Sequence, residues 1–404
     1  MKRSGAADLP LHGGHVPYWL SERMTQLGGA IIESLVFHYG PSEVLKRLSD
    51  PFWFQAFGAV LGMDWHSSGI TTSVMGALKR ALNPKAAELG IYICGGKGIH
   101  SRNTPGELLK ISEKQGLNAD ALIRSSRLTA RIDNNAIQDG FQLYLHSFIV
   151  TRSGEWAVVQ QGMNESTQMA RRYHWLSSNI QSFEEEPHTS IYGHNQGLIL
   201  NLTDKAAAPT RNRLLDLTRE NPAMMLKEVQ MLKMPMRHEL QTSDVNLKRL
   251  GSVLALAHET EVKNFEELIL LKDLGPRTLQ AMTLVSEVIH GTPSRFHDPA
   301  RFSFAHGGKD GHPFPVLTKV YDETIATLKH AVDKAGIGHS DKVQAIKKLS
   351  QIALEIEKDF IPNDNFDKII ETERANAFKY EGRTVFGKSK KPKDKGSSQL
   401  NLFE

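Results

Sequence analysis

Residues 141–161 read FQLYLHSFIVTRSGEWAVVQQ, and this stretch decides the fold class. Most residues of 141–150 and 156–161 are apolar, aromatic or β-branched. The turn-forming sequence Arg152-Ser153-Gly154 lies between the two runs. Two such runs joined by a short glycine-containing connection predict a β-hairpin. Further strands are expected at residues 91–94, which precede a glycine-rich run, and at residues 198–202.

Helices are expected on both sides of these strands. Apolar residues recur at helical spacing from 17 to 82, and the breaks at Gly40-Pro41 and Asp50-Pro51 predict three or four packed helices. Helical spacing also predicts helices at residues 105–115, 119–135 and 165–178. This mixture of helices and strands predicts one N-terminal α/β domain over residues 1–205.

The sequence changes character after residue 205. Almost every segment of residues 211–360 has helical periodicity, with breaks at 221–222, 235, 291–315 and 336–338. This pattern predicts an all-α domain over residues 206–375. Residues 388–395 then carry five lysines against one aspartate, within a stretch rich in Gly, Ser and Pro. Such a segment cannot bury enough apolar surface to fold, so residues 376–404 are expected to form a disordered basic tail. The predicted fold class is α+β.

Composition limits the kind of protein this can be. The formal net charge of +4 is too small for a protein that coats nucleic acid by bulk electrostatics, so any DNA contact must come from local patches. The single cysteine excludes an internal disulfide framework, and neither a signal peptide nor a membrane-spanning run is evident. We expect a cytoplasmic, nucleoid-associated protein with no membrane partner.

The clearest local motif is FEELILLKDLGPRTLQAMTL at residues 265–284, within a predicted unit of two helices and a tight hairpin over 263–290. A short helix ends in a tight turn, and Pro276 stands at the first position of the next helix. The unit resembles the helix-hairpin-helix of DNA-repair proteins, although Asp273 replaces the first glycine of that family's hairpin. The resemblance implies contacts to DNA phosphates without base reading. The residues expected to make them are Lys272, Leu274, Gly275, Arg277 and Thr278; a plain αα-corner is the alternative.

Base-excision glycosylases carry a catalytic aspartate after the same hairpin, and Asp298 lies at a roughly comparable distance. The lysine of bifunctional glycosylases is replaced by Arg277, which cannot form a Schiff base. A monofunctional glycosylase that uses Asp298 is therefore one alternative. In the other interpretation, Asp298-Pro299 caps a turn.

Polar clusters at the ends of predicted elements suggest a shared site in the first domain. The sequence Asp64-Trp-His66-Ser-Ser-Gly could supply metal ligands, with Asp64 and His66 binding Mg²⁺ or Mn²⁺ together with another carboxylate. Alternatively, the Ser, Gly and Thr residues within 67–72 could bind a phosphate that Lys97 and Arg102 neutralise. The catalytic candidates are Asp64, His66, Asp133, Asp139 and Gln160.

A nuclease of the restriction-endonuclease type would need Asp139 before the hairpin and a Glu-x-Lys on the second strand. Gln160 and Gly162 occupy those two positions, which departs from the pattern. The following sequence, 168–175, places Arg171 and Arg172 among Tyr, His and Trp on a predicted helix, a surface suited to phosphates and stacked bases. A solvated basic face is the alternative.

The strings DWHSSGITT, GGKG, QDGFQLY, VVQQGMN and ARRYHW, taken together, resemble a family of uncharacterised archaeal and bacterial proteins. That family is known only as a domain of unknown function with a helix-hairpin-helix. The resemblance covers most of residues 5–360 and implies the architecture but no activity.

Residues 399–403, QLNLF, lie behind the basic tail. They resemble the pentapeptide by which bacterial polymerases and repair proteins bind the DNA polymerase sliding clamp. In that interpretation Gln399 forms hydrogen bonds at one edge of a cleft on the clamp, and Leu400, Leu402 and Phe403 fill apolar pockets.

Together these features predict a DNA-binding protein of replication or repair, tethered to the sliding clamp and acting on the DNA backbone as a metal-dependent nuclease. A DNA glycosylase and a non-enzymatic DNA-binding adaptor are the alternatives. An adaptor would tolerate alanine throughout the N-terminal clusters, whereas an enzyme would not.

Overall fold

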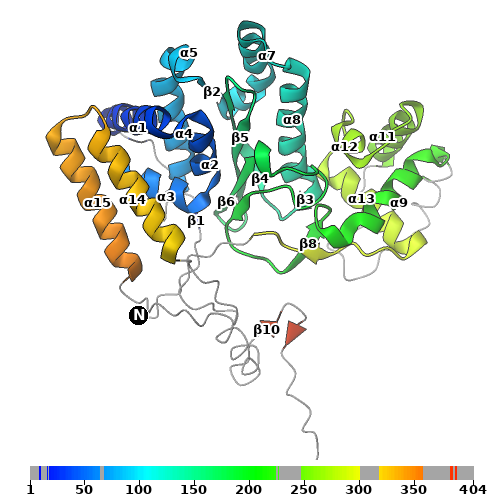
Figure 1. The fold of residues 1–404 in the computed structure, drawn as a ribbon. Helices are drawn as coiled ribbons and strands as arrows, with labels where there is room; N and C mark the ends of the chain where they lie inside the picture. Colours follow the sequence, from blue (N-terminus) through cyan, green and yellow to red (C-terminus); the bar gives the residue numbers. More distant parts are fainter. Residues whose placement is uncertain are drawn as a thin grey trace, which may run out of the picture.

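A central antiparallel sheet organises the molecule, in a computed structural model that describes residues 9–10, 16, 18–63, 68–223, 226, 247–300, 318–357, 383–384 and 387–388. This sheet has six strands in the order β1-β6-β5-β4-β2, and β7 pairs with the same edge of β6 as β1. Helices cover both faces of the sheet (Figure 1). The α+β fold class is confirmed. The strands are β1 (Leu9–Pro10), β2 (Ile91–Lys97), β4 (Gln142–Thr151), β5 (Trp156–Asn164), β6 (Met169–Leu176) and β7 (Ser190–Tyr192).

The predicted hairpin is confirmed as strands β4 and β5. They pair in antiparallel register from Val150 opposite Trp156 to Gln142 opposite Met163, with an irregularity between Leu143 and Leu145. The strands expected at 91–94 and 198–202 are also present. The second of these belongs to a smaller sheet of order β3-β8-β9, formed by β3 (Ile137–Gln138), β8 (Leu198–Asn201) and β9 (Phe296–His297).

The helix expected at residues 165–178 is wrong, because residues 169–176 form strand β6. This strand pairs with β5 along its whole length, from Asn164 opposite Met169 to Ala157 opposite Leu176. Every residue from Ala170 to Leu176 is buried, although the sequence is largely polar. A strand buried on both faces lacks the alternation of apolar and polar residues that identifies a half-buried strand, so periodicity could not reveal it.

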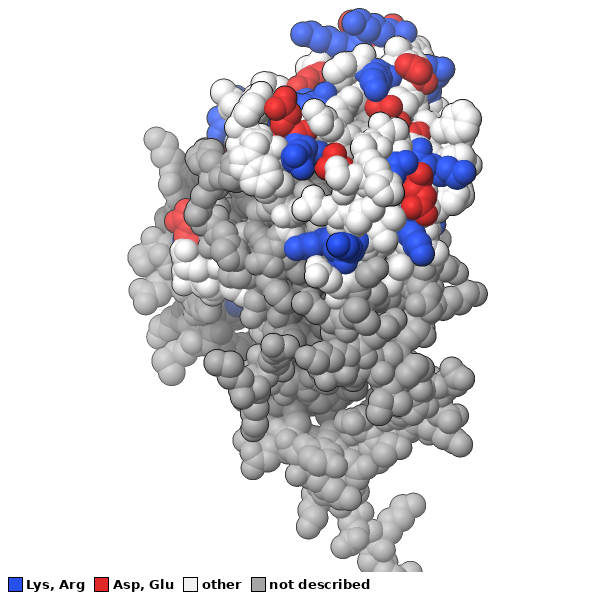
Figure 2. All heavy atoms as spheres, turned by 90° about the vertical axis from the view of Figure 1, so that its left-hand side faces the viewer, with Lys and Arg blue, Asp and Glu red and all other residues white. Residues whose placement is uncertain are grey.

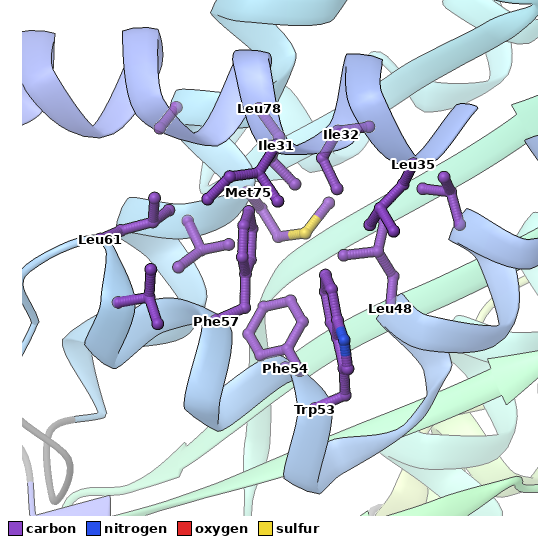
Figure 3. Packing of buried hydrophobic residues seen from close by; sticks show 14 of the residues in the cluster. Ile31, Ile32, Leu35, Leu48, Trp53, Phe54, Phe57, Leu61, Met75 and Leu78 are labelled. Carbon is purple, nitrogen blue, oxygen red and sulfur yellow. The ribbon is translucent and has the colours of Figure 1, made fainter. Parts of the chain in front are cut away.

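Four helices cover one face of the sheet with a large apolar core. Asp50 caps α3, where its carboxylate accepts from the Trp53 N–H at 2.9 Å and Pro51 occupies the first helical position. The Trp53 and Phe57 rings stack 4.9 Å apart beneath Ile31 and Leu35 of α1 (Figure 3). These helices are α1 (Tyr18–Tyr39), α2 (Pro41–Ser49), α3 (Pro51–Val60) and α4 (Gly69–Leu82).

The opposite face of the sheet carries a second core. Phe148, Val158 and Trp175 project from β4, β5 and β6 into it, where they meet apolar residues of the helices between residues 104 and 290. One continuous core therefore joins the sheet to helices from both predicted domains. The helices on this side are α7 (Thr104–Gln115), α8 (Ala119–Arg131), α9 (Ala208–Arg219), α11 (Leu247–Glu259), α12 (Phe265–Leu270) and α13 (Pro276–His290).

Helices α14 (Thr318–Lys334) and α15 (His339–Glu357) pack elsewhere. Leu328, Val332 and Leu349 belong to the core of α1 to α4, and Figure 1 shows both helices beside α1, away from α9 to α13. Strand β9 also pairs with β8 of the first predicted domain. The described part of residues 206–375 is thus divided between the two faces of the sheet and does not form one separate helical body, which departs from the predicted boundary.

The remaining described elements are short. None of the helices in the described residues is long and apolar enough to cross a membrane. The short elements are α5 (Ala86–Leu89), α6 (Ile99–Arg102), the π-helical turn η2 (Ile132–Ala136), the 3-10 turns η1 (Asn83–Lys85), η3 (Ser177–Asn179) and η4 (Lys205–Ala207), and the pair β10 (Arg383–Thr384) and β11 (Gly387–Lys388).

Candidate functional site

The predicted helix-hairpin-helix is present as α12, a tight turn and α13. Asn264 caps α12 by accepting from the Glu267 N–H at 2.9 Å, and Gly275 is the residue before α13, whose first residue is Pro276. Leu274 at the tip is fully buried, whereas Lys272 and Arg277 on either side are exposed. The turn therefore has a buried apolar anchor between two exposed cations.

Asp273 takes the backbone conformation that the first glycine of the hairpin pattern would provide. Its φ is 66°, in the left-handed region that non-glycine residues rarely enter and that Asp and Asn tolerate best. The departure from the family pattern therefore keeps the backbone path of the hairpin. It adds a carboxylate at the tip, which opposes an approaching phosphate by charge.

Side chains of α8, η2 and β3 bind the carbonyl groups of the hairpin. The Leu274 carbonyl accepts from Arg131 Nη1 at 2.7 Å and from Asn135 Nδ2 at 3.0 Å. The Pro276 carbonyl accepts from Gln138 Nε2 at 2.7 Å. These three bonds fix the turn against the sheet domain. The first-turn N–H groups of α13 have no acceptor within their own helix, so they can donate to a ligand.

Asp298 lies in a buried ion-pair network. Arg171 donates to its two carboxylate oxygens at 2.9 and 2.7 Å, and the Gln196 and Ala300 N–H groups donate to it at 2.8 and 3.0 Å. The side chains of Asp298 and Arg171 are both completely buried. In this arrangement the carboxylate binds internal donors and holds the segment after β9 against β6, as expected of a structural aspartate.

Asp139 belongs to the same network. It accepts from Arg171 Nη1 at 2.8 Å, from the Tyr173 hydroxyl at 2.6 Å and from the Phe141 N–H at 3.0 Å. Burial raises the pKa of Asp139, and the Arg171 charge beside it opposes that shift. Burial alone would lower the pKa of Arg171, but the charges of Asp139 and Asp298 together raise it. The predicted catalytic role of Asp139 therefore competes with its hydrogen bonds to three internal donors.

Asp133 and Gln160, also predicted as catalytic, meet in a second buried network on the same face of the sheet. Asp133 accepts from Gln160 Nε2, from Trp175 Nε1 at 3.0 Å and from His188 Nε2. Burial raises the pKa of Asp133, and His188 is the main opposing influence. The His188 and Trp175 ring centroids are 4.2 Å apart. Sequence reasoning missed His188, because no pattern around it links it to Asp133.

The network continues through His146, whose tautomer follows from its partners. Because the Gln160 amide nitrogen donates to Asp133, its oxygen faces His146 Nδ1 and accepts from it at 2.8 Å. His146 Nε2 then accepts from the Ser126 hydroxyl at 2.8 Å. Burial lowers the pKa of His146 to about 4, so the ring is neutral at pH 7.

Arg171 and Arg172, predicted as an exposed helical surface for DNA, are buried in strand β6. Arg172 lies on the other face of the sheet from Arg171. Its guanidinium donates to Gln55 Oε1 at 2.8 Å and lies 4.6 Å from the Phe54 ring centroid. Its Nε donates to His174 Nε2 at 2.9 Å, and burial lowers the pKa of His174 well below its usual value. Neither arginine is part of a surface, because each guanidinium is enclosed by protein groups.

Lys97 and Arg102, predicted to neutralise a phosphate, are exposed at the end of β2 and in α6. Asp64 and His66, and the tail residues Gln399, Leu400, Leu402 and Phe403, lie outside the described residues. Within the described residues no group of three or more His, Cys, Asp or Glu could hold a metal ion. The predicted metal site therefore depends on residues 64–67.

One comparison with known proteins gives a match. A family model described as "Protein of unknown function (DUF763)" matches residues 5–316. No curated protein and no solved structure matches the chain.

Proposed function

Since the chain belongs to the DUF763 family, whose function is unknown, we propose a function from its own residues: it binds DNA through backbone phosphates at the α12–α13 hairpin. The observation that carries the proposal is the form of this hairpin. The buried Leu274 anchors a tight turn, exposed Lys272 and Arg277 flank it, and a helix of 15 residues begins immediately after it.

Two physical effects favour a phosphate at this place. The N-terminus of α13 carries the positive end of the helix dipole and N–H groups that lack intrahelical acceptors. Lys272 and Arg277 add two positive charges that face solvent. Arg131, Asn135 and Gln138 already hold the turn in place, so binding requires little further ordering.

The charge distribution supports a local contact. The net charge is only +4, and Figure 2 shows Lys and Arg interspersed with Asp and Glu over the described part of the face that carries α14 and α15. Mixed charges produce no broad positive field on that face. A DNA contact therefore needs a specific local site such as the hairpin.

The test is fluorescence anisotropy with labelled duplexes of unrelated sequence over a range of salt concentrations. Lys272→Glu with Arg277→Glu should weaken binding to every duplex and reduce the salt slope by about 2, because two phosphate contacts are lost. Lys329→Glu, an exposed charge reversal on α14, should leave binding within about twofold of wild type, since it removes no direct phosphate contact. Wild-type affinity in the hairpin variant would remove the hairpin from the proposal.

We further propose that the protein cleaves the DNA backbone with the help of a metal ion. This proposal rests on the sequence. Asp139, Gln160 and Asp298 all bind internal partners, so a metal-dependent centre would have to be built from Asp64 and His66. Labelled nicked, flapped, single-stranded and base-damaged DNA, incubated with Mg²⁺ or Mn²⁺, tests it. Cleavage that Asp64→Ala abolishes while DNA affinity stays unchanged would support a nuclease. Complete absence of cleavage would favour the adaptor.

We also propose that residues 399–403 bind the bacterial sliding clamp. The support is the sequence QLNLF, which places large apolar residues in a lysine-rich segment. Binding through the hairpin would hold the tail near a clamp on the same DNA and raise its effective concentration there. The peptide alone should bind modestly, because ordering it offsets part of the contact energy.

A further inference from the structure

A cavity lies on the opposite face of the sheet from the hairpin. It has a volume of about 540 Å³ and lies between α4, the end of β2 and strand β4. Leu145 and Ser147 of β4 form one wall, and they alternate with His146 and Phe148, which point to the hairpin side. The cavity is therefore separated from the proposed DNA contact by the thickness of the sheet.

The rim of this cavity is cationic. Arg80, Lys97 and His100 line it and are exposed, and Lys79 lies deeper. Lys79 is neutralised by Glu107, whose carboxylate oxygens are both 2.8 Å from Nζ. No Asp or Glu is among the residues that line the cavity. The rim therefore carries positive charge toward the opening.

Arg80 and Lys97 have no acidic partner among the described residues. Arg80 donates only to neutral hydroxyls, at 2.8 Å to Ser21 and 3.1 Å to Thr25. Lys97 Nζ lies 5.9 Å from the centroid of the Tyr144 ring and forms no described salt bridge. Two uncompensated cations at the mouth of a cavity attract an anion, and a phosphate group can accept hydrogen bonds from both of them.

The glycines of the GGKG sequence create this geometry. Gly95 has φ +81°, and a Cβ there would overlap the His146 carbonyl oxygen and lie 2.6 Å from Thr104 Oγ1. Gly96 at φ +138° and Gly98 at φ +60° then turn the chain from β2 into α6. The turn brings Lys97 and His100 to the same opening as Arg80.

The inner wall is apolar and larger than a phosphate needs. Met75 and Leu145 are buried at the wall, with Pro84 at its edge. A volume of 540 Å³ falls within the range of about 300–1,000 Å³ that small-molecule sites occupy. We propose that this cavity binds a nucleotide, with its phosphate at Arg80 and Lys97 and its base against Met75 and Leu145.

Either a free mononucleotide or the terminal nucleotide of a single strand would present this chemistry. Isothermal titration calorimetry of the full chain should show saturable binding of dAMP, weaker binding of inorganic phosphate, and weaker binding of unphosphorylated deoxyadenosine. Competition by a 5′-phosphorylated trideoxyadenylate would assign the site to strand ends. Failure of that oligonucleotide to compete with dAMP would assign it to free nucleotides.

Variants test nucleotide binding at the cavity separately from protein stability and from DNA binding at the hairpin. Lys97→Gln with Arg80→Gln should lower dAMP affinity at least tenfold. Gly76→Leu should block the cavity, since a Cβ at Gly76 meets nothing nearer than Arg80 Nη1 at 3.5 Å. Lys110→Gln, an exposed lysine on α7 outside the lining, should bind like wild type. Thermal melts report whether each variant is folded, and Lys97→Gln alone avoids the Arg80 contacts to α1.

Four results would overturn the proposal. These are no saturable dAMP binding by wild type, equal affinity for inorganic phosphate and dAMP, and unchanged affinity in folded Lys97→Gln or in folded Gly76→Leu. The Lys272→Glu, Arg277→Glu variant should keep dAMP affinity while losing duplex binding. The proposed nucleotide site and the proposed DNA contact can therefore be refuted independently of each other.

Discussion

Replacing Asp298 with alanine tests the buried network that joins the segment after β9 to the sheet. The change removes both acceptors of the bidentate contact to Arg171, at 2.9 and 2.7 Å, and leaves the Arg171 charge with Asp139 alone. It also removes the acceptor of the Gln196 and Ala300 N–H groups. The Arg171 guanidinium cannot turn to solvent, because its side chain is fully buried.

The size of the effect follows from this burial. Removing one partner of a buried ion pair costs about 3–5 kcal/mol. Although Asp139 stays beside Arg171, the buried guanidinium loses two of its hydrogen-bond acceptors. The entropy of unfolding of a cooperative unit of about 300 residues is about 0.6 kcal/mol/K. The melting temperature of Asp298→Ala should therefore fall by about 5–8 °C.

Differential scanning fluorimetry measures this shift, with Asp216→Ala as the matched control. Asp216 also pairs with two cations, Arg213 at 3.1 Å and Arg219 at 3.4 Å, but its side chain is 41% exposed. An exposed pair contributes about 0–1 kcal/mol, so the control should melt within about 2 °C of wild type. Equal melting temperatures for Asp298→Ala and wild type would refute the structural role. Lost glycosylase activity without lost stability would instead restore Asp298 as a catalytic candidate.

Three further predictions concern the GGKG turn, His146 and the tail. Gly95→Ala should destabilise the fold strongly because its Cβ overlaps the His146 carbonyl, whereas Gly98→Ala, with φ +60° and open space, should cost only about 1–2 kcal/mol in thermal melts. Burial lowers the pKa of His146 from 6.5 to about 4, so the folded state should lose up to about 3 kcal/mol as pH falls from 6.5 to 4. Urea titrations at both pH values should show a smaller loss of stability for His146→Gln than for wild type. An equal loss of stability would assign the acid sensitivity to other groups. A labelled peptide of residues 396–404 should bind purified clamp and be displaced by a known clamp ligand, and Leu402→Ala with Phe403→Ala should abolish binding; binding that survives would exclude this motif.

Local sequence determined the elements whose stabilising contacts are close along the chain. The β4–β5 hairpin follows from two apolar runs around Arg152-Ser153-Gly154, and α3 follows from Asp50-Pro51. The α12–α13 unit follows from the turn before Pro276, and even its unusual Asp273 keeps the left-handed backbone. In each case the turn or cap lies within a few residues of the element that it specifies, so pattern and chemistry agree.

The candidate sites were predicted less completely. Asp133 and Gln160 do meet, but they meet with His188 and Trp175 in a closed set of internal hydrogen bonds. The cavity beside Lys97 depends on Arg80, and no sequence pattern predicts that Arg80 lies near the GGKG turn. Neither association has a fixed spacing in sequence, because each joins separate elements that only the packed sheet brings together.

Only the tertiary structure decided strand β6 and the division of the C-terminal helices. Arg171 can lie in a buried strand because Asp298, 127 residues away, supplies the opposite charge. Helices α14 and α15 pack on α1 and α3 and not on α13, although all of these have apolar faces of helical spacing. An apolar stripe shows that a helix must be covered but does not say by what, and a buried charge is stable only beside its partner. Local sequence therefore specified the elements, whereas long-range pairing of charges and apolar faces specified their arrangement.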